Sequence, residues 1–188
     1  MNLQSQNPAL LLIDIQKGMD DAAYWGGNRN NPEAEANAAY LLEQWRARDL
    51  PVFHIQHSSQ NPESRLHASQ PGFAIKDEVR PLPDEPVILK NVNSAFIGTD
   101  LQERLKAQNI ITVVLVGLTT NHCVSSTTRM AGNYGYNTLV VSDATATFDR
   151  EGINGEHYDA ETIHLTTLAS LRDEFATIVT TEQLMARL

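Results

Sequence analysis

The sequence contains a single cysteine, Cys123, in 188 residues. A lone cysteine excludes an internal disulfide framework, and we expect the chain to work in a reducing compartment. Clusters of lysine and arginine are also missing, and the formal net charge is −9. A chain of this charge is not expected to bind nucleic acid or an anionic membrane surface.

Targeting features and nucleotide-binding motifs are absent from the sequence as well. The N-terminus, MNLQSQNPALLLIDIQ, has no basic segment, and its apolar run is too short for a signal peptide or a membrane span. We therefore expect a cytoplasmic protein with no membrane partner. Neither GxGxxG nor GxxxxGKS occurs, so neither a dinucleotide site nor a P-loop is supported, and we expect no cofactor.

Strand-like and helix-like segments alternate along the chain. Apolar runs predict strands at 9–15, 51–55, 87–90, 110–116, 137–142 and 175–179. Helical periodicity predicts helices at 31–48, 99–108, from 120 or 121 to about 135, at 156–172 and after Thr180. Asn31 is the expected cap of the first helix, and the spacing of Thr99 to Gln102 and of Thr180 to Gln183 predicts a capping box at the start of two others. This alternation predicts an α/β fold, a three-layer helix–sheet–helix sandwich with parallel strands, in one domain over 1–188.

The chain is organised around the stretch 110–129, IITVVLVGLTTNHCVSSTTR. Its apolar, mostly β-branched start predicts a strand buried on both faces, followed by a polar turn and a helix. Cys123 falls in the first turn of that helix. The unpaired N–H groups and the helix dipole there favour a thiolate, so we expect the pKa of Cys123 to be lowered.

Two further chemically active side chains follow predicted strands. Asp14 ends the first strand and Lys90 ends the third, while Cys123 follows the central strand. The carboxyl ends of parallel strands lie at one edge of a sheet, where α/β proteins bind ligands. An acid, a cation and a thiol at one edge are what covalent acyl transfer requires. Each residue alone has a structural alternative: Asp14 as a loop cap, Lys90 as a solvated charge, and Cys123 as packing.

Five stretches carry a resemblance to a known family: LLLIDIQKGM (10–19), VILKNVNSAF (87–96), GTDLQERL (98–105), VVLVGLTTNHCVSSTTRMAGNYGY (113–136) and VVSDATATF (140–148). In this order they resemble the isochorismatase-like cysteine hydrolases, which include nicotinamidases, N-carbamoylsarcosine amidases and isochorismatase. The resemblance implies a six-stranded parallel sheet of order 321456. It also implies that Asp14, Lys90 and Cys123 form the catalytic triad.

The resemblance further implies a cis peptide bond between Leu118 and Thr119, and an oxyanion hole formed by the backbone amides of Thr119 and Cys123. The implied mechanism is hydrolysis of a C–N bond in a small linear amide, carbamoyl or ureido compound through a thioester. Lys90 would stabilise the thiolate, and Asp14 would move the proton from the thiol to the leaving amine.

The sequence departs from the metal-binding nicotinamidases of this family. Those enzymes carry an aspartate and histidines after the second strand, whereas this chain reads HIQHSSQ, with His54 and His57 but no nearby aspartate. We expect His54 to be a core or sheet residue, and we expect no metal site. His57, at the end of its strand, is a candidate for the substrate pocket, with a place elsewhere left open.

Three other side chains are candidates for the pocket walls. Gln16 lies two residues after Asp14, Trp25 lies in the first loop, and Phe96 follows the lysine strand. Each could close over a small planar substrate, with simple packing as the alternative.

Two other functions stay open. One is an isochorismatase-type vinyl-ether hydrolase, although such enzymes tend to lack the nucleophilic cysteine. The other is a flavodoxin-like binding or thiol-sensing module without turnover, which would not need both Asp14 and Lys90. Members of the resembled family are commonly dimers or higher oligomers, so the resemblance implies a homo-oligomer, most simply a two-fold dimer. The apolar residues of the long segment 57–86 must cover either the pocket or another subunit, and we expect this segment to contact the partner chain near the edge that carries the triad.

Overall fold

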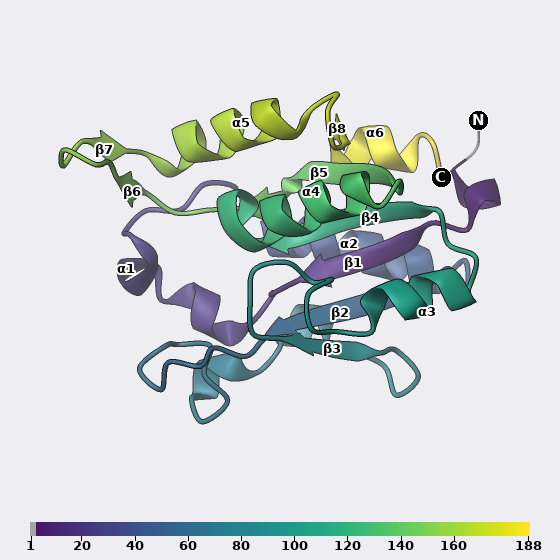
Figure 1. Ribbon diagram of the computed structural model, residues 1–188, viewed down its shortest axis with the longest axis horizontal. Coiled ribbons are helices and arrows are strands. Elements are labelled where there is room, and N and C mark those ends of the chain that lie inside the picture. The colour runs from purple at the N-terminus through teal and green to yellow at the C-terminus, as the bar shows by residue number, and fades with distance from the viewer. Residues whose placement is uncertain (1–2) are drawn as a thin grey trace.

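A six-stranded parallel sheet forms the centre of the molecule. The computed structural model describes residues 3–188, so Met1 and Asn2 of the predicted domain lie outside the described residues. The strands follow the order β3-β2-β1-β4-β5-β8 (Figure 1). Their bounds are β1 (Ala9–Ile13), β2 (Val52–His57), β3 (Val87–Lys90), β4 (Thr112–Leu118), β5 (Asn137–Ala146) and β8 (Thr177–Val179). This is the order 321456, so the predicted fold is confirmed.

Helices cover both faces of the sheet (Figure 1). One face packs against α2 (Ala34–Arg46) and α6 (Thr181–Met185), and the other against α3 (Leu101–Ala107), α4 (Ser125–Asn133) and α5 (Ala160–Leu171). Beyond the sheet lie the short helix α1 (Ala22–Trp25) and a hairpin of β6 (Arg150–Glu151) and β7 (His157–Tyr158). Within residues 3–188, no helix combines the length and apolar character needed to cross a membrane.

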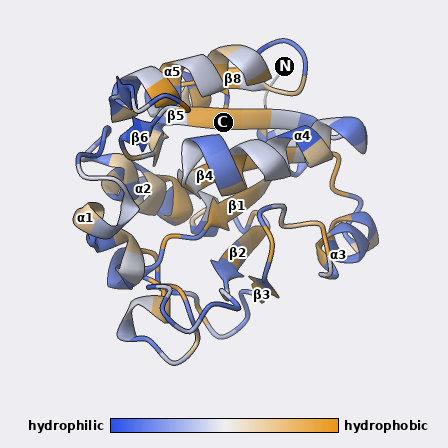
Figure 2. Ribbon diagram, turned by 60° about the vertical axis from the view of Figure 1, so that its left-hand side comes forward, coloured by the Kyte–Doolittle hydropathy of each residue, from blue (hydrophilic) through white to orange (hydrophobic). Residues whose placement is uncertain are grey.

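The two central strands have no solvent-facing side. Every residue of β1 and β4 is buried, as expected for a sheet covered on both faces. Leu10 and Leu12 of β1 contribute to the core beneath α2, whereas Leu11 and Ile13 contribute to the core beneath α4, because successive strand side chains point to opposite faces. Figure 2 shows β5 as a hydrophobic band between α4 and α5.

Gly117 allows β4 to approach β1 closely. A Cβ atom at this position would lie 2.0 Å from the carbonyl oxygen of Ile13, and the residue has φ of 116°. Only glycine tolerates both conditions. The pairing register between β4 and β5 also shifts between Leu115 and Gly117. The glycine therefore ends the regular strand and leads into the turn that carries Cys123.

Several predicted element ends differ from the structure. β5 continues to Ala146, four residues beyond its predicted end. Asn31 does not cap α2: its side-chain amide instead donates to the carbonyl groups of Ser142 and Thr145. The predicted capping box at Thr99 does not form, because α3 begins after Asp100 without a side-chain cap. The capping box of Thr180 and Gln183 is present at α6.

The long segment 57–86 packs on its own chain. It contains two short 3₁₀ turns, η3 (Pro71–Phe73) and η4 (Asp77–Val79). Leu66 and Val79 are buried in the core beneath α2, and Ile75 packs against it. Of the two roles predicted for these apolar residues, the structure therefore shows cover within the chain, so they give no argument for a contact with a partner.

Candidate active site

The fold brings Asp14, Lys90 and Cys123 together at the carboxyl ends of the central strands. Asp14 directly follows β1, Lys90 ends β3, and Cys123 lies five residues after β4. Asp14 has φ of 49°, a conformation uncommon for residues other than glycine but more accessible to aspartate. Its amide donates to the carbonyl of Ile55 on β2 at 2.9 Å, which fixes the carboxylate above the sheet edge.

Lys90 forms a fully buried ion pair with Asp14. Its Nζ lies 2.7 Å from Asp14 Oδ2, and neither side chain is exposed to solvent. The same ammonium also donates to His57 Nδ1 at 3.0 Å and to the carbonyl of Val92 at 3.3 Å. Burial alone would lower the pKa of Lys90, but the negative charge and hydrogen bond of Asp14, with a smaller contribution from Cys123, outweigh it and raise the pKa. Lys90 therefore stays a cation.

Cys123 lies in a π-helical turn, η5 (Thr120–Val124), which leads directly into α4. The peptide bond between Leu118 and Thr119, just before this turn, is cis, as the resemblance implied. The carbonyl of Thr119 accepts from the amides of His122 and Val124, and Thr120 Oγ1 lies 2.9 Å from Nδ1 of the buried His164 on α5. These contacts hold the cysteine turn at a fixed place over the sheet.

The thiol of Cys123 is not poised as a thiolate. Burial and the nearby Asp14 carboxylate raise its pKa, and the positive charge of Lys90 offsets this only in part. The prediction of a lowered pKa was therefore wrong for this state, because the side chain is only 8 % exposed and faces a carboxylate. The thiol is 3.8 Å from Asn93 Oδ1, to which it donates.

A cavity of about 220 Å³ opens beside the thiol. Asp14, Thr119 and Cys123 line one part of it. The rest of the lining comes from Met19, Trp25, His57, Ser59, Ser64, Leu66, Asn93 and His122. The structure thus places two of the four predicted pocket residues, Trp25 and His57, at the cavity. Trp25 is fixed by a hydrogen bond from its indole Nε1 to the carbonyl of Gly18, at 2.8 Å.

The other two predicted pocket residues, Gln16 and Phe96, do not line the cavity. The amide of Gln16 bonds to both backbone groups of His57 and to the carbonyl of Phe73, so it ties the long segment to β2. Phe96 lies in the core and stacks on Tyr136, with ring centroids 6.0 Å apart. Their placement at the pocket wall was therefore wrong.

The remaining lining residues were not predicted. His122 directly precedes Cys123 and Asn93 comes three residues after Lys90, so their position in the turns after the same strands was a usable signal. Ser59, Ser64 and Leu66 come from the long segment, whose path no local pattern reveals. Nδ1 of His122 lies 3.3 Å from both Thr119 Oγ1 and Arg150. Burial and the charge of Arg150 lower the pKa of His122.

Three potential metal ligands lie close together at this site, but the ammonium of Lys90 already contacts two of them. Among residues 3–188, ligand atoms of Asp14, His57 and Cys123 lie within 4.8 Å of one another, a donor set that suits zinc in kind. The ammonium of Lys90, however, already donates to both Asp14 and His57. A divalent cation would have to displace it.

His54 is 1 % exposed with Nε2 2.8 Å from Glu85, which confirms its prediction as a core residue.

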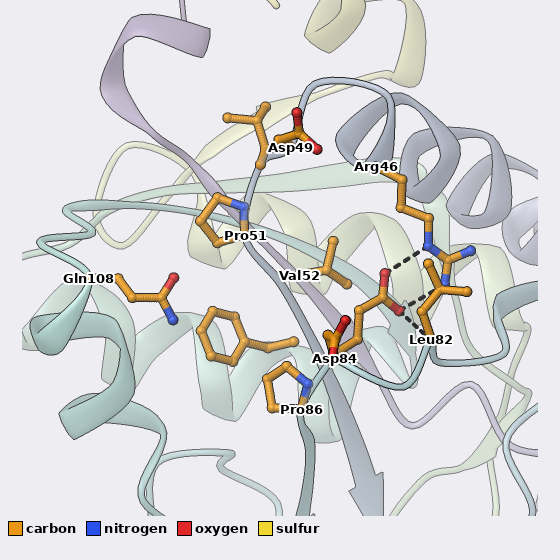
Figure 3. A pocket seen from close by; sticks show the side chains of 11 residues that line it. Arg46, Asp49, Pro51, Val52, Leu82, Asp84, Pro86 and Gln108 are labelled. Atoms are coloured by element: carbon orange, nitrogen blue, oxygen red, sulfur yellow. Dashed lines mark hydrogen bonds and ion pairs between the residues drawn. The ribbon is translucent and has the colours of Figure 1, made fainter.

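A second hollow, of about 360 Å³, lies at the opposite edge of the sheet, at the amino ends of β2 and β3 (Figure 3). Its main charged groups are already paired, because Arg46 donates to both carboxylate oxygens of Glu85. The lining contains no nucleophile comparable to Cys123. The cavity at Cys123 is therefore the candidate active site.

Comparisons with known proteins place this geometry in context. The isochorismatase domain family matches residues 8–183. The uncharacterized isochorismatase family protein YrdC of Bacillus subtilis is 52 % identical over 180 residues, which cover 96 % of this chain and 95 % of YrdC. Nicotinamidase 3 of Arabidopsis thaliana is 28 % identical over 194 residues, with 96 % and 88 % covered.

Solved structures agree with these sequence matches. A crystal structure from Chromobacterium violaceum, assigned to the isochorismatase family of hydrolases, superimposes with a TM-score of 0.94 at 42 % identity and covers 100 % of this chain and 96 % of its own. The N-carbamoylsarcosine amidase of Thermoplasma acidophilum superimposes with a TM-score of 0.72 at 28 % identity, with 93 % and 96 % covered.

Proposed function

The chain belongs to the isochorismatase family of hydrolases, and from this premise we propose that it is a cysteine amidohydrolase. Its substrate is a small linear amide, carbamoyl or ureido compound, and the bond cleaved is C–N. The amidase names among its relatives support this chemistry. Retention of Cys123 favours it over the hydrolysis of a vinyl ether, which needs protonation rather than acyl transfer.

In the first step, Cys123 Sγ attacks the substrate carbonyl while its proton passes to Asp14. The thiol is neutral at rest, so attack and proton transfer must be coupled. Oδ2 of Asp14 is held by Lys90, whereas Oδ1 is buried with no hydrogen-bond partner among residues 3–188. Oδ1 is the oxygen available to take the proton. Lys90 stays protonated and stabilises the negative charge that develops on sulfur.

The tetrahedral intermediate then collapses. Its oxyanion accepts hydrogen bonds from the backbone amides of Thr119 and Cys123. Asp14 returns the proton to the leaving nitrogen, the C–N bond breaks, and ammonia or an amine departs, leaving a thioester on Cys123. Water then attacks the thioester, Asp14 takes its proton, and the acid product leaves as the proton returns to sulfur.

One observation carries this proposal: a buried, charge-paired Asp14–Lys90 couple lies beside the only thiol of the chain, and the thiol and carboxylate line one small cavity. A cavity of about 220 Å³ is smaller than typical drug-sized sites, which supports a small substrate. A binding module without turnover would gain no benefit from burying an ion pair at this place.

The proposal is tested by incubating the purified protein with a panel of small primary amides, N-carbamoyl compounds and ureides and measuring released ammonia. We expect turnover of at least one compound, and its loss in Cys123→Ala. A vinyl-ether substrate belongs in the same panel, with its turnover followed by the carbonyl product, because this reaction releases no ammonia. Turnover of that compound alone would assign the chain to the other branch of the family.

We also propose that the chain forms a homo-oligomer, most simply a two-fold dimer. Apolar side chains exposed on and after the edge strand β3 support this: Val87 is 42 % exposed, Leu89 54 %, Val92 39 % and Ile97 49 %. Monomeric proteins rarely expose neighbouring apolar groups on an unpaired strand, because such edges associate.

A further inference from the structure

The hydrogen bond between Lys90 and His57 fixes the protonation of the His57 ring. Lys90 Nζ has only protons to offer, so His57 Nδ1, 3.0 Å away, must be the acceptor. A neutral imidazole then carries its single proton on Nε2. Burial and the charge of Lys90 both lower the pKa of His57, which keeps the ring neutral near pH 7.

The backbone of His57 is held as firmly as its ring. His57 pairs with Lys90 across β2 and β3, so both side chains lie at the same place on the sheet edge. The side-chain amide of Gln16 accepts from the His57 amide at 2.9 Å and donates to its carbonyl at 3.1 Å. His57 lines the cavity, and within residues 3–188 the hydrogen bond of its ring is the one from Lys90 to Nδ1, which leaves Nε2 unpaired. The Nε2–H group is therefore free to donate to a molecule in the cavity.

The charge of the cavity indicates what this donor binds. Among residues 3–188, the lining includes no lysine or arginine. Its one carboxylate, Asp14, forms an ion pair with Lys90, which does not itself line the cavity. An anionic group in the cavity would lie near Asp14 without a cation to pair with. An uncharged oxygen acceptor suits a neutral N–H donor better.

We propose that His57 is a specificity residue whose Nε2–H binds a second, uncharged carbonyl oxygen of the substrate, next to the scissile amide. The preferred substrates are therefore diamides and ureides rather than simple aliphatic amides. The same residue positions Lys90 through Nδ1. This inference rests on the proposed amide hydrolysis for its substrate, but the hydrogen-bonding role of His57 is measurable without turnover.

Two substitutions separate the two nitrogen atoms of His57. In His57→Asn, the amide oxygen lies near the position of Nδ1 and still accepts from Lys90, but nothing reaches the position of Nε2. In His57→Gln, the amide nitrogen reaches the position of Nε2, but the acceptor for Lys90 is lost. His67→Asn is the matched control, because the side chain of His67 bonds only to nearby Ser69 in an exposed turn.

Three probes test discrimination: butyramide, succinamide with a second uncharged carbonyl, and succinamate with a carboxylate. We expect wild type and the His67→Asn control to favour succinamide over butyramide by about tenfold in kcat/KM. The preference falls to about one in His57→Asn and persists in His57→Gln. A wild-type preference near one, or an unchanged preference in His57→Asn, would overturn the proposal. A preference for succinamate would overturn the uncharged substrate class.

A second readout reports binding and the position of Lys90 without turnover. Each probe is tested for protection of Cys123 against iodoacetamide, and the pH midpoint of labelling is measured without probe. We expect succinamide to protect best. Of the two His57 variants, only His57→Gln should lower the pH midpoint of labelling, because Lys90 then loses its acceptor at Nδ1 and can donate that proton to the sulfur. Protection lost in His57→Asn without any ammonia release supports this inference and removes the proposed function. Ammonia release with equal protection by all probes supports the proposed function and overturns this inference.

Discussion

The buried pair of Asp14 and Lys90 makes a quantitative prediction. Neither side chain is exposed, and their charged atoms are 2.7 Å apart, so removing one partner leaves an uncompensated charge in the interior. We expect Asp14→Asn and Lys90→Met each to lower the free energy of unfolding by about 3–5 kcal/mol. For a chain of this size the loss corresponds to a fall in melting temperature of roughly 6–20 °C. Asparagine suits the positive φ of position 14, so backbone strain adds little.

The double variant separates stability from chemistry. Asp14→Asn combined with Lys90→Met removes both charges, so its stability should lie within about 2 kcal/mol of wild type, a coupling of about 4 kcal/mol or more. Its activity should not return, because loss of the general base alone lowers kcat by roughly 10²–10⁴. Urea unfolding at one fixed protein concentration gives the free energies.

The exposed pair of Lys17 and Asp77, with its charged atoms at a similar distance of 2.8 Å, is the matched control. The same cycle there, with Lys17→Met and Asp77→Asn, should give a coupling of about 1 kcal/mol or less, because solvent screens the charges. The reasoning is refuted if the coupling energy of the buried pair is no larger than that of this exposed pair. It is also refuted if the stability losses of the two single variants simply add, because each charge then does not depend on the other.

Three other predictions concern reactivity, metals and assembly. The pH midpoint for alkylation of Cys123 by iodoacetamide should lie above that of free cysteine, and it should fall in Asp14→Asn and rise in Lys90→Met, because burial and Asp14 raise the thiol pKa whereas Lys90 lowers it; a midpoint below free cysteine contradicts this. EDTA should leave ammonia release unchanged, and a loss restored by zinc or iron would show that His57 and its neighbours hold a catalytic metal. Sedimentation at micromolar concentration should detect a dimer or larger oligomer that Leu89→Glu weakens; a fully active wild-type monomer would remove the proposed assembly.

Most of the sheet was predictable because burial on two faces leaves a strong local signal. The apolar runs of β1 and β4 and the match of β3 to its predicted bounds need no long-range information. The hairpin of β6 and β7 was not predicted, since strands of two residues have no usable period. Asn31 also misled the prediction, because its side-chain partners on β5 lie more than 100 residues further along the chain.

In the candidate active site, too, local sequence signals predicted some residues, whereas long-range contacts decide the place of others. Asp14, Lys90 and Cys123 were predictable because strand ends bring them to one edge, whatever the loops do. Gln16 looked like a pocket residue from its spacing to Asp14, but its partners at His57 and Phe73 are 41 and 57 residues away and turn it into a structural tie. The thiol pKa was predicted from a local helix dipole, whereas burial and a carboxylate from another strand determine it.

The central claim, acyl transfer through Cys123 with Asp14 as its base, is tested most directly by trapping the intermediate. The best amide from the panel is mixed with enzyme, quenched with acid during steady turnover, and the intact protein and its peptides are weighed by mass spectrometry. We predict an added acyl group on the peptide that contains Cys123, absent in Cys123→Ala and strongly reduced in Asp14→Asn. Full turnover of the same amide by Cys123→Ala would contradict the account.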